Sequence, residues 1–317
     1  MSEARQPLVR DRVEGASPAQ GVDALTLDRS DDGVVTLTLR QPGRPVVVLD
    51  WALLRAIDSA LDRVAQTDGL RGFVLASEGR VFIAGANLQE IMDLSDERLH
   101  EYLRFGQKVY GRIATLPCAT VAAINGAALG GGLEIAMHCD HLIGAEPAPG
   151  TPEKPAKPYQ VGLPEAGLCI CPGWGGTNLL PARMDPGRAI EMTATGRTMT
   201  VLDAAKAGLI EELVMPDRLL PRAREIARTP KASARTTPIC LAESARRSAA
   251  LAALEHVRPS LPTTPSAAAV IVCVESGISR GWHAALDAER ESLVRLRNSP
   301  EGRAAINQFF EKSGSNR

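Results

Sequence analysis

The chain has 317 residues, 44% of them hydrophobic, and a formal net charge of -1. This size and composition allow a large buried core, which excludes an intrinsically disordered protein. The near-zero net charge argues against bulk electrostatic binding to nucleic acid or to an anionic membrane. The longest strongly apolar run, residues 267–274, is well short of the roughly 20 residues that a membrane helix needs. We therefore expect neither nucleic acid nor a membrane as partner.

The N-terminal segment mixes acidic and basic side chains and contains no apolar stretch. A secretory signal needs such a stretch, and a transit peptide is poor in acidic residues. We therefore expect residues 1–20 to form a disordered tail on a cytoplasmic protein.

Cysteine and histidine usage gives no metal site. None of the six cysteines forms a Cys-x-x-Cys pair, so buried thiols are expected. The run HCDH at residues 138–141 has no second ligand group at zinc-site spacing. We expect a structural role for it, and no metal.

The first half of the chain alternates strand and helix patterns. GVVTLTLR (33–40) alternates like a half-buried strand, and PVVVLD (45–50) is a β-branched run expected to pair with it. Asp50 then caps a helix with one apolar face. Further helices are expected at 95–116 and 131–139, and further strands at 72–77, 119–126, 141–146 and 159–164. Such alternation predicts an α/β fold.

The remainder of the chain is predicted to be mostly helical from residue 216. The stretch EPAPGTPEKPAKP (146–158) has no periodicity and is expected to be a surface loop. Arg and Lys residues cluster between 222 and 235, where helical spacing favours a solvated face over a site for an anionic partner. We expect a core at 21–215 and a helical C-terminal region at 216–317.

The stretch NGAALGGGLEIAMHCD (125–140) places three glycines at a helix start. Unpaired N–H groups there can receive an oxyanion when no side chain blocks the approach. The N–H of Gly131 is the candidate donor. Close packing of the helix on the sheet explains the glycines equally well.

A second stretch, VFIAGANLQEI (81–91), ends a strand near Gly85 and begins a helix near Asn87. The N–H of Ala86 can face the same oxygen. Two backbone donors from separate segments are the geometry of an oxyanion hole.

Two glutamates accompany these donors. Glu134 lies in the first turn after the glycines, where an acid can simply stabilise the helix. Glu165 follows Pro164 between apolar residues, although an ordinary loop acid also fits. Two glutamates beside an oxyanion hole suit general acid/base chemistry on an acyl group. The chain has no G-x-S-x-G, P-loop or G-x-G-x-x-G motif.

These motifs, together with VGLPEAGLCICPGWGGTNLLPARM and AIEMTATGRTMTVLDAAKAGLIEELV, resemble the enoyl-CoA hydratase/isomerase (crotonase) family in order and spacing. The resemblance covers about residues 34–214. It implies a spiral of stacked β-β-α units with a helical C-terminal region. It also implies an acyl-CoA substrate, with coenzyme A as part of the substrate and no separate cofactor.

The resemblance also carries site residues onto this chain. It implies Ala86 and Gly131 as the oxyanion hole, Glu134 as the residue that activates water, and Glu165 as the proton donor to Cα. Coenzyme A is expected along Val46, Val48, Ala84, Asn87, Leu88 and Gly130. Val48, Asn87 and Gln89 depart from the common pattern, which weakens the expected phosphate contacts. Both glutamates together favour enoyl-CoA hydration in β-oxidation.

Several alternatives stay open. Isomerisation, acyl-CoA hydrolysis and acyl-CoA binding without catalysis fit the same fold. The C-terminal sequence resembles the linker helix after the hydratase domain in the multifunctional subunit of the fatty-acid oxidation complex. Such a helix can fold back on its own domain, whereas simpler relatives form trimers or hexamers. We expect a homotrimer.

Overall fold

The computed structural model describes residues 11–12, 24–150 and 157–314. The tail expected at residues 1–20 lies outside the described residues except for Asp11–Arg12. The centre of the proline-rich loop, residues 151–156, lies outside them as well.

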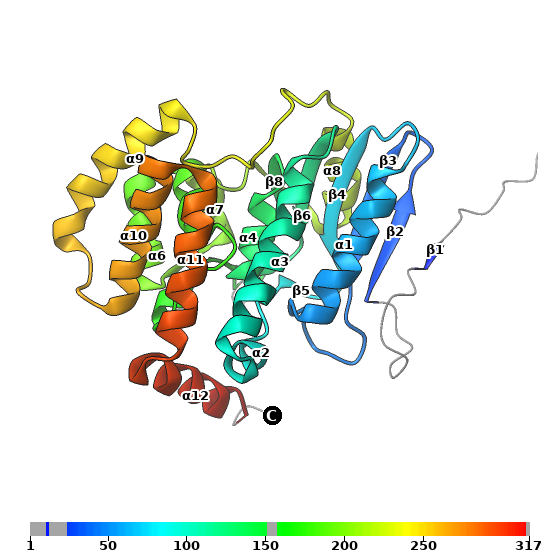
Figure 1. The fold of residues 1–317 in the computed structure, drawn as a ribbon. Helices are drawn as coiled ribbons and strands as arrows, with labels where there is room; N and C mark the ends of the chain where they lie inside the picture. Colours follow the sequence, from blue (N-terminus) through cyan, green and yellow to red (C-terminus); the bar gives the residue numbers. More distant parts are fainter. Residues whose placement is uncertain (1–10, 13–23, 151–156, 315–317) are drawn as a thin grey trace, which may run out of the picture.

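A seven-stranded sheet runs through the described part of the molecule in the order β1-β2-β3-β4-β6-β8-β11 (Figure 1). The first three strands pair antiparallel and the others parallel. The strands are β1 (Asp11–Arg12), β2 (Leu25–Arg29), β3 (Val34–Leu39), β4 (Gly72–Ser77), β6 (Ala119–Ile124), β8 (His141–Ala145) and β11 (Glu212–Val214).

A smaller sheet has the order β10-β9-β7-β5. Its strands are β5 (Val81–Ile83), β7 (Ala127–Leu129), β9 (Gln160–Gly162) and β10 (Thr198–Thr200). Because β5, β7 and β9 each follow a strand of the main sheet along the chain, the chain winds repeatedly from one sheet to the other. This confirms the predicted α/β spiral.

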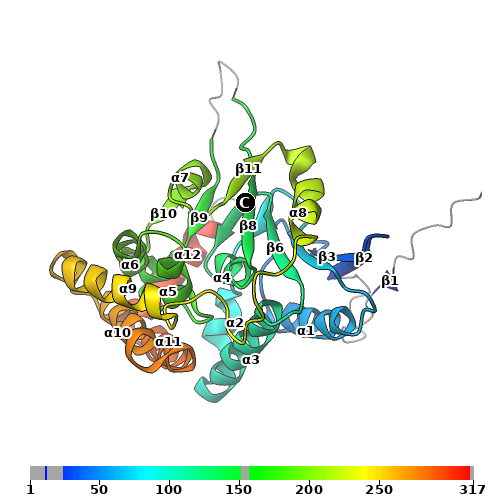
Figure 2. The same cartoon turned by 90° about the horizontal axis from the view of Figure 1, so that it is seen from above.

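The main sheet is covered on both faces. In β4, Phe73 and Leu75 belong to the core that includes α1 and α3, whereas Val74 and Ala76 pack in a second cluster with α8. Alternate strand residues point to opposite faces, so a strand apolar throughout must be covered twice. Figure 2 shows α1 and α8 on opposite sides of this sheet.

The helices surround both sheets, and α9, α10 and α11 pack side by side at one end while α12 runs across below them (Figure 1). The helices are α1 (Trp51–Ala65), α2 (Leu88–Asp93), α3 (Asp96–Ala114), α4 (Gly131–Met137), α5 (Gly176–Leu179), α6 (Pro186–Thr195), α7 (Val201–Lys206), α8 (Leu219–Ala227), α9 (Ser244–Val257), α10 (Pro265–Arg280), α11 (Trp282–Arg297) and α12 (Pro300–Gly314). Short 3-10 helices are η1 (Glu165–Leu168), η2 (Leu180–Ala182), η3 (Pro216–Arg218) and η4 (Arg258–Ser260).

One predicted strand pairing was wrong. PVVVLD does not pair with β3: Val47 and Leu49 instead hydrogen bond with the backbone after β5, where Leu49 bridges Ala86. Residues of this run, Val46 and Val48, line the cavity described below. The predicted helical C-terminal stretch forms two helices here, since Gly281, with a φ of 89°, ends α10 before α11 begins. Such a φ is accessible to glycine at little cost.

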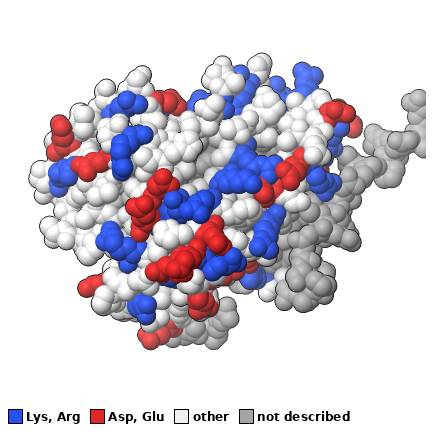
Figure 3. Space-filling model, viewed as in Figure 1, with Lys and Arg blue, Asp and Glu red and all other residues white. Residues whose placement is uncertain are grey.

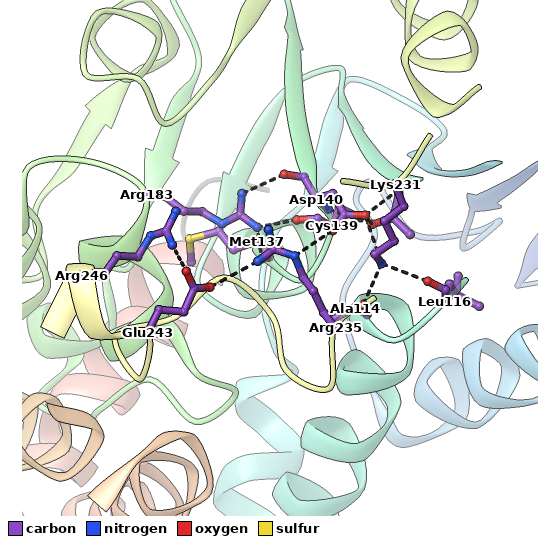
Figure 4. Close-up of polar contacts among 11 residues, drawn as sticks. Ala114, Leu116, Met137, Cys139, Asp140, Arg183, Lys231, Arg235, Glu243 and Arg246 are labelled. Atoms are coloured by element: carbon purple, nitrogen blue, oxygen red, sulfur yellow. Dashed lines mark hydrogen bonds and ion pairs between the residues drawn. The ribbon is translucent and has the colours of Figure 1, made fainter. Parts of the chain in front are cut away.

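The basic segment before α9 is not a solvated face throughout. The Lys231 side chain is only 7% exposed, and its Nζ lies 3.2 Å from Asp140 Oδ2. Lys231 also donates to the carbonyl oxygens of Ala114 and Leu116. Arg235 reaches Asp140 and Glu243, so the segment is tied to the end of α4 by a polar network (Figure 4).

Lys231→Met is expected to lower the free energy of unfolding by about 1–3 kcal/mol, because it leaves two carbonyl oxygens and a buried carboxylate short of a donor. Lys206→Met is the matched control. Lys206 is 79% exposed and lies 3.9 Å from Asp203, so its loss should cost less than about 0.5 kcal/mol. Urea unfolding of both variants measures the difference. Equal effects would contradict the internal role of Lys231.

The molecular surface carries mixed charge. Basic and acidic side chains lie interspersed on the face shown in Figure 3. None of the helices in the described parts of the chain combines the length and apolar character needed to cross a membrane.

Candidate active site

A cavity of about 570 Å³ lies where the end of β5, the start of α4 and η1 meet. Its wall is mostly apolar, and Glu134 and Glu165 are the two acidic residues among those that line it. All ten residues predicted for the site border it: Val46, Val48, Ala84, Ala86, Asn87, Leu88, Gly130, Gly131, Glu134 and Glu165. Segments about 120 residues apart in sequence therefore meet at one cavity.

Glu134 is held by two backbone amides. It lies in the first turn of α4 and is 1% exposed. Its Oε1 accepts hydrogen bonds from Trp174 N and Gly176 N, both at 2.8 Å. Burial raises the pKa of Glu134, the charges of Glu289 and Glu165 raise it further, and the two amides oppose this rise. The carboxyl group is thus fixed in place by donors that favour its ionised form.

Glu165 has a different environment. It begins η1, and its buried Oε2 has no hydrogen-bond partner among the described residues. Burial raises the pKa of Glu165 to about 8, with the charge of Glu289 also raising it. A buried carboxyl oxygen without a donor favours the neutral acid. Glu165 can therefore carry a proton near neutral pH.

Gly130 makes room for Glu165. A Cβ added to Gly130 would lie 2.5 Å from Glu165 Oε1, and the Gly130 φ of 52° is unfavourable for residues with a side chain. The backbone conformation of Gly130 therefore favours glycine, and the absence of a side chain leaves room for the Glu165 carboxyl group. This contact connects the glycine motif to the second glutamate, which sequence alone did not reveal.

The other two glycines serve close packing. A Cβ on Gly131 would lie 2.4 Å from the Trp174 ring, and one on Gly132 would lie 2.4 Å from the Ile83 carbonyl oxygen. The structural explanation of this motif is therefore confirmed. It does not compete with the oxyanion explanation, since the same absence of side chains leaves the helix start open to the cavity.

Two backbone donors border the cavity in the expected places. Ala86 forms a parallel bridge to Leu49 in which Leu49 bonds to Gly85 O and Asn87 N. In such a bridge the N–H of Ala86 points away from Leu49. Gly131 is the first residue of α4, so its N–H has no partner within the helix. Both residues line the cavity, and their role as an oxyanion hole stays a prediction.

Asn87 has a local structural role as well. Its Oδ1 accepts from Gln89 N at 3.1 Å and from Glu90 N at 3.4 Å, which caps α2. Gln89 donates to Asp93. The two residues that depart from the family pattern, Asn87 and Gln89, thus have structural roles in α2: Asn87 caps the helix, and Gln89 bonds to Asp93.

Sequence reasoning allowed the C-terminal helices to cover the site but did not name the residues that they contribute. Leu293 of α11 and Phe309 and Phe310 of α12 line the cavity. Trp174 lines it too, and its ring packs on Tyr102 and Tyr110 at centroid distances of 5.5 and 5.2 Å. The GWGG sequence was a usable signal for Trp174. The helix residues carried none, because their apolar spacing is that of ordinary core positions.

The HCDH run does not bring its histidines together. His138 is buried, with its ring against Tyr110 and Trp282, and burial lowers its pKa to about 4. His141 Nδ1 lies 2.8 Å from Glu211 Oε2. Within residues that the structure describes, no group of three or more His, Cys, Asp or Glu could hold a metal ion.

Stability should depend on pH through three carboxyl groups in and beside the cavity. Burial raises the pKa of Glu134, that of Glu165 to about 8 and that of Glu289 to about 7, from the ordinary 4.5. The folded chain then binds more protons than the unfolded chain above pH 4.5, so the free energy of unfolding falls as pH rises from about 4.5 to about 8. Urea unfolding at about pH 5 and about pH 9 measures this. Glu165→Gln should flatten the decline, and a rise in stability over this range would contradict the assignment.

Comparison with known proteins agrees with this geometry. The model of the enoyl-CoA hydratase/isomerase family matches residues 29–259. An enoyl-CoA hydratase structure from Bacillus anthracis is 27% identical, with 92% of this chain and 97% of that chain covered and a TM-score of 0.58. DspI from Pseudomonas aeruginosa is 25% identical, with coverage of 94% and 97% and a TM-score of 0.56.

A third structure supports the fold. An enoyl-CoA hydratase/isomerase from Pseudoalteromonas atlantica is 20% identical over 92% of this chain and 98% of that chain, with a TM-score of 0.63. The family match spans most of the chain, including both glutamates and both predicted backbone donors. The chain therefore belongs to the enoyl-CoA hydratase/isomerase family.

Proposed function

We propose that this protein is an enoyl-CoA hydratase, which adds water across the 2,3 double bond of a 2-enoyl-CoA to give a 3-hydroxyacyl-CoA. One observation carries the choice of hydration. Two carboxyl groups border one cavity, and their hydrogen bonds differ: Glu134 accepts two amides, whereas the buried Oε2 of Glu165 accepts none from the described residues. Carboxyl groups in contrasting environments can divide base and acid roles between them.

The reaction needs charge stabilisation at the thioester oxygen. When water attacks Cβ, negative charge develops on that oxygen as the enolate forms. In our proposal it lies between the N–H groups of Ala86 and Gly131. Donors positioned before reaction, in a cavity with few polar groups, stabilise such charge strongly.

The two glutamates then move protons. Glu134, as the carboxylate, holds the attacking water and accepts its proton; the amides of Trp174 and Gly176 offset part of the rise in pKa that burial causes. Glu165 holds the same water on its other side and donates its proton to Cα. The proton on Glu134 passes to Glu165 through the next bound water, which restores the starting state.

The rest of the cavity fits an acyl thioester. Apolar side chains from α3, α11 and α12 surround the space beyond the glutamates, among them Leu103, Leu293 and Phe310. We propose that the acyl chain lies there and that coenzyme A extends along Val46, Val48, Ala84 and Leu88. Coenzyme A is part of the substrate, and the proposed chemistry uses no separate cofactor.

The test is a direct assay with 2-enoyl-CoA esters of short and medium chain length. Hydration removes the absorbance of the conjugated thioester, and the product carries a hydroxyl group. A parallel assay with 3-enoyl-CoA detects double-bond isomerisation, and thiol release detects hydrolysis. Absorbance loss with a hydroxylated product supports the proposal. Turnover only of 3-enoyl-CoA, or only release of free coenzyme A, would overturn it.

A further inference from the structure

A third carboxyl group, that of Glu289, lies close to the cavity without lining it. Glu289 of α11 is fully buried and does not line the cavity. Its Oε2 accepts from Gly175 N at 2.5 Å. Its Oε1 accepts from Thr177 N at 2.9 Å and from Thr177 Oγ1 at 2.5 Å. These three hydrogen bonds all join Glu289 to one short segment, residues 175–177.

That segment also holds Glu134. Along residues 174–177, the N–H groups of Trp174 and Gly176 point to Glu134, and those of Gly175 and Thr177 point to Glu289. Successive amides thus alternate between the two carboxyl groups. The segment is clamped from both sides, and its orientation toward Glu134 depends on what holds its other side.

The other anchors of the segment also come from α3 and α11. Gln107 of α3 donates to the carbonyl oxygens of Gly173 and Leu286 at 2.9 Å, and Arg290 donates to Gln107 at 2.9 Å. Leu293, one helical turn beyond Glu289, lines the cavity. The C-terminal region is therefore connected to the cavity through α11.

We propose that Glu289 is a positioning residue for Glu134. It fixes residues 174–177 so that the amides of Trp174 and Gly176 hold the Glu134 carboxylate at the cavity. This inference rests on the proposed hydration. Glu289 acts through the segment and does not touch the substrate.

The charges around this clamp are mostly acidic. Arg290, next to Glu289 in sequence, is directed to Gln107 and Asp287. The titratable groups near Glu134 or Glu289 on neighbouring elements include Glu165 on η1, Tyr110 on α3, His138 just after α4, and Cys171 before α5, which contacts Cys273 of α10. The negative charge of Glu289 raises the pKa of Glu134. Removing it should therefore make Glu134 easier to ionise.

Glu289→Gln tests both effects. Gln replaces one oxygen with an NH2 group, which then faces a backbone N–H whichever way the amide turns, so one anchor is lost. We expect kcat to fall about 10- to 100-fold, as for a catalytic group displaced by a fraction of an ångström to an ångström. KM should change little, since Glu289 does not line the cavity. The low-pH limb of the kcat/KM profile should move to lower pH.

Two further variants complete the experiment. Glu291→Gln removes an equal charge from an exposed position on the same helix and should match the wild type. Thr177→Val removes the hydroxyl that donates to Glu289 and accepts from Asn178, while all four amides of the segment remain, so it should lower kcat at unchanged KM. Circular dichroism and thermal unfolding establish that each variant is folded.

The outcomes separate the inference from the proposed function. A wild type that hydrates no 2-enoyl-CoA would overturn the function and, with it, this role of Glu289. An active wild type and a folded Glu289→Gln variant with the same kcat and pH profile would overturn the positioning role alone. If Glu289→Gln does not fold, Thr177→Val decides: lowered kcat at unchanged KM supports the inference, and wild-type kcat overturns it.

Discussion

Replacing Glu165 with glutamine is expected to lower kcat for hydration of a 2-enoyl-CoA by about 10²- to 10⁴-fold. Glutamine keeps the size of the side chain but cannot deliver a proton to Cα. The Glu165 Oε2, which has no hydrogen-bond partner in the described part of the chain, and the pKa of Glu165, raised to about 8, support a protonated acid at neutral pH. Glu134→Gln should cause a loss of similar size by removing the acceptor for the water proton. Steady-state kinetics with one good substrate measures both.

Measuring the thermal stability of the Glu165→Gln variant shows whether a loss of kcat comes from the chemistry or from unfolding. Ionising a buried Glu165 is costly, so the neutral glutamine should leave thermal stability unchanged or raise it above about pH 8. Glu191→Gln is the control, because Glu191 forms an exposed ion pair with Arg197. It should alter neither quantity. Glu165→Gln with wild-type kcat would remove Glu165 from the mechanism.

Gly130→Ala is expected to lower kcat by about 10²-fold, because the new Cβ would push the Glu165 carboxyl group from its place. The Cβ would lie 2.5 Å from Glu165 Oε1. The positive φ adds strain, so the free energy of unfolding should fall by about 1–3 kcal/mol. Kinetics and urea unfolding on the same preparation give both numbers.

Gly208→Ala is the control that introduces backbone strain from a positive φ without a contact to Glu165. Gly208 has a φ of 79°, and no atom lies within 4 Å of a Cβ added there. This variant should lose stability by a similar amount and keep its kcat. A Gly130→Ala enzyme as active as Gly208→Ala would contradict the contact between the glycine motif and Glu165.

The sequence predicted most helices and strands near the site, because caps, apolar runs and glycine turns depend on neighbouring residues in the chain. The Asp50 cap, the strand GFVLAS and the helix after the triple glycine all formed as expected. Two glycine motifs and two glutamates were chosen as site residues from sequence, and all of them border one cavity. The predicted pairing of PVVVLD with β3 was wrong because a β-branched composition indicates an extended backbone but does not indicate which strand it pairs with.

Long-range polar contacts could not be read from sequence. Lys231 lies in a run of basic residues with the spacing of a solvated helix, yet its ammonium group is drawn inward by Asp140. Glu289 sits in ALDAERESL, which resembles any charged helix. Its burial follows from the packing of α11 against α3, α5 and α10. Only the folded chain reveals that it faces the loop that holds Glu134.

The most direct test of the two-glutamate account is the fate of solvent atoms in a single reaction. A 2-enoyl-CoA is incubated with the wild-type enzyme in deuterated water enriched in heavy oxygen, and the product is analysed by mass spectrometry and NMR. The account predicts a 3-hydroxyacyl-CoA with one solvent oxygen at Cβ and one solvent deuterium at Cα. A product that contains no solvent oxygen, or free coenzyme A with solvent oxygen in the released acid, would contradict it.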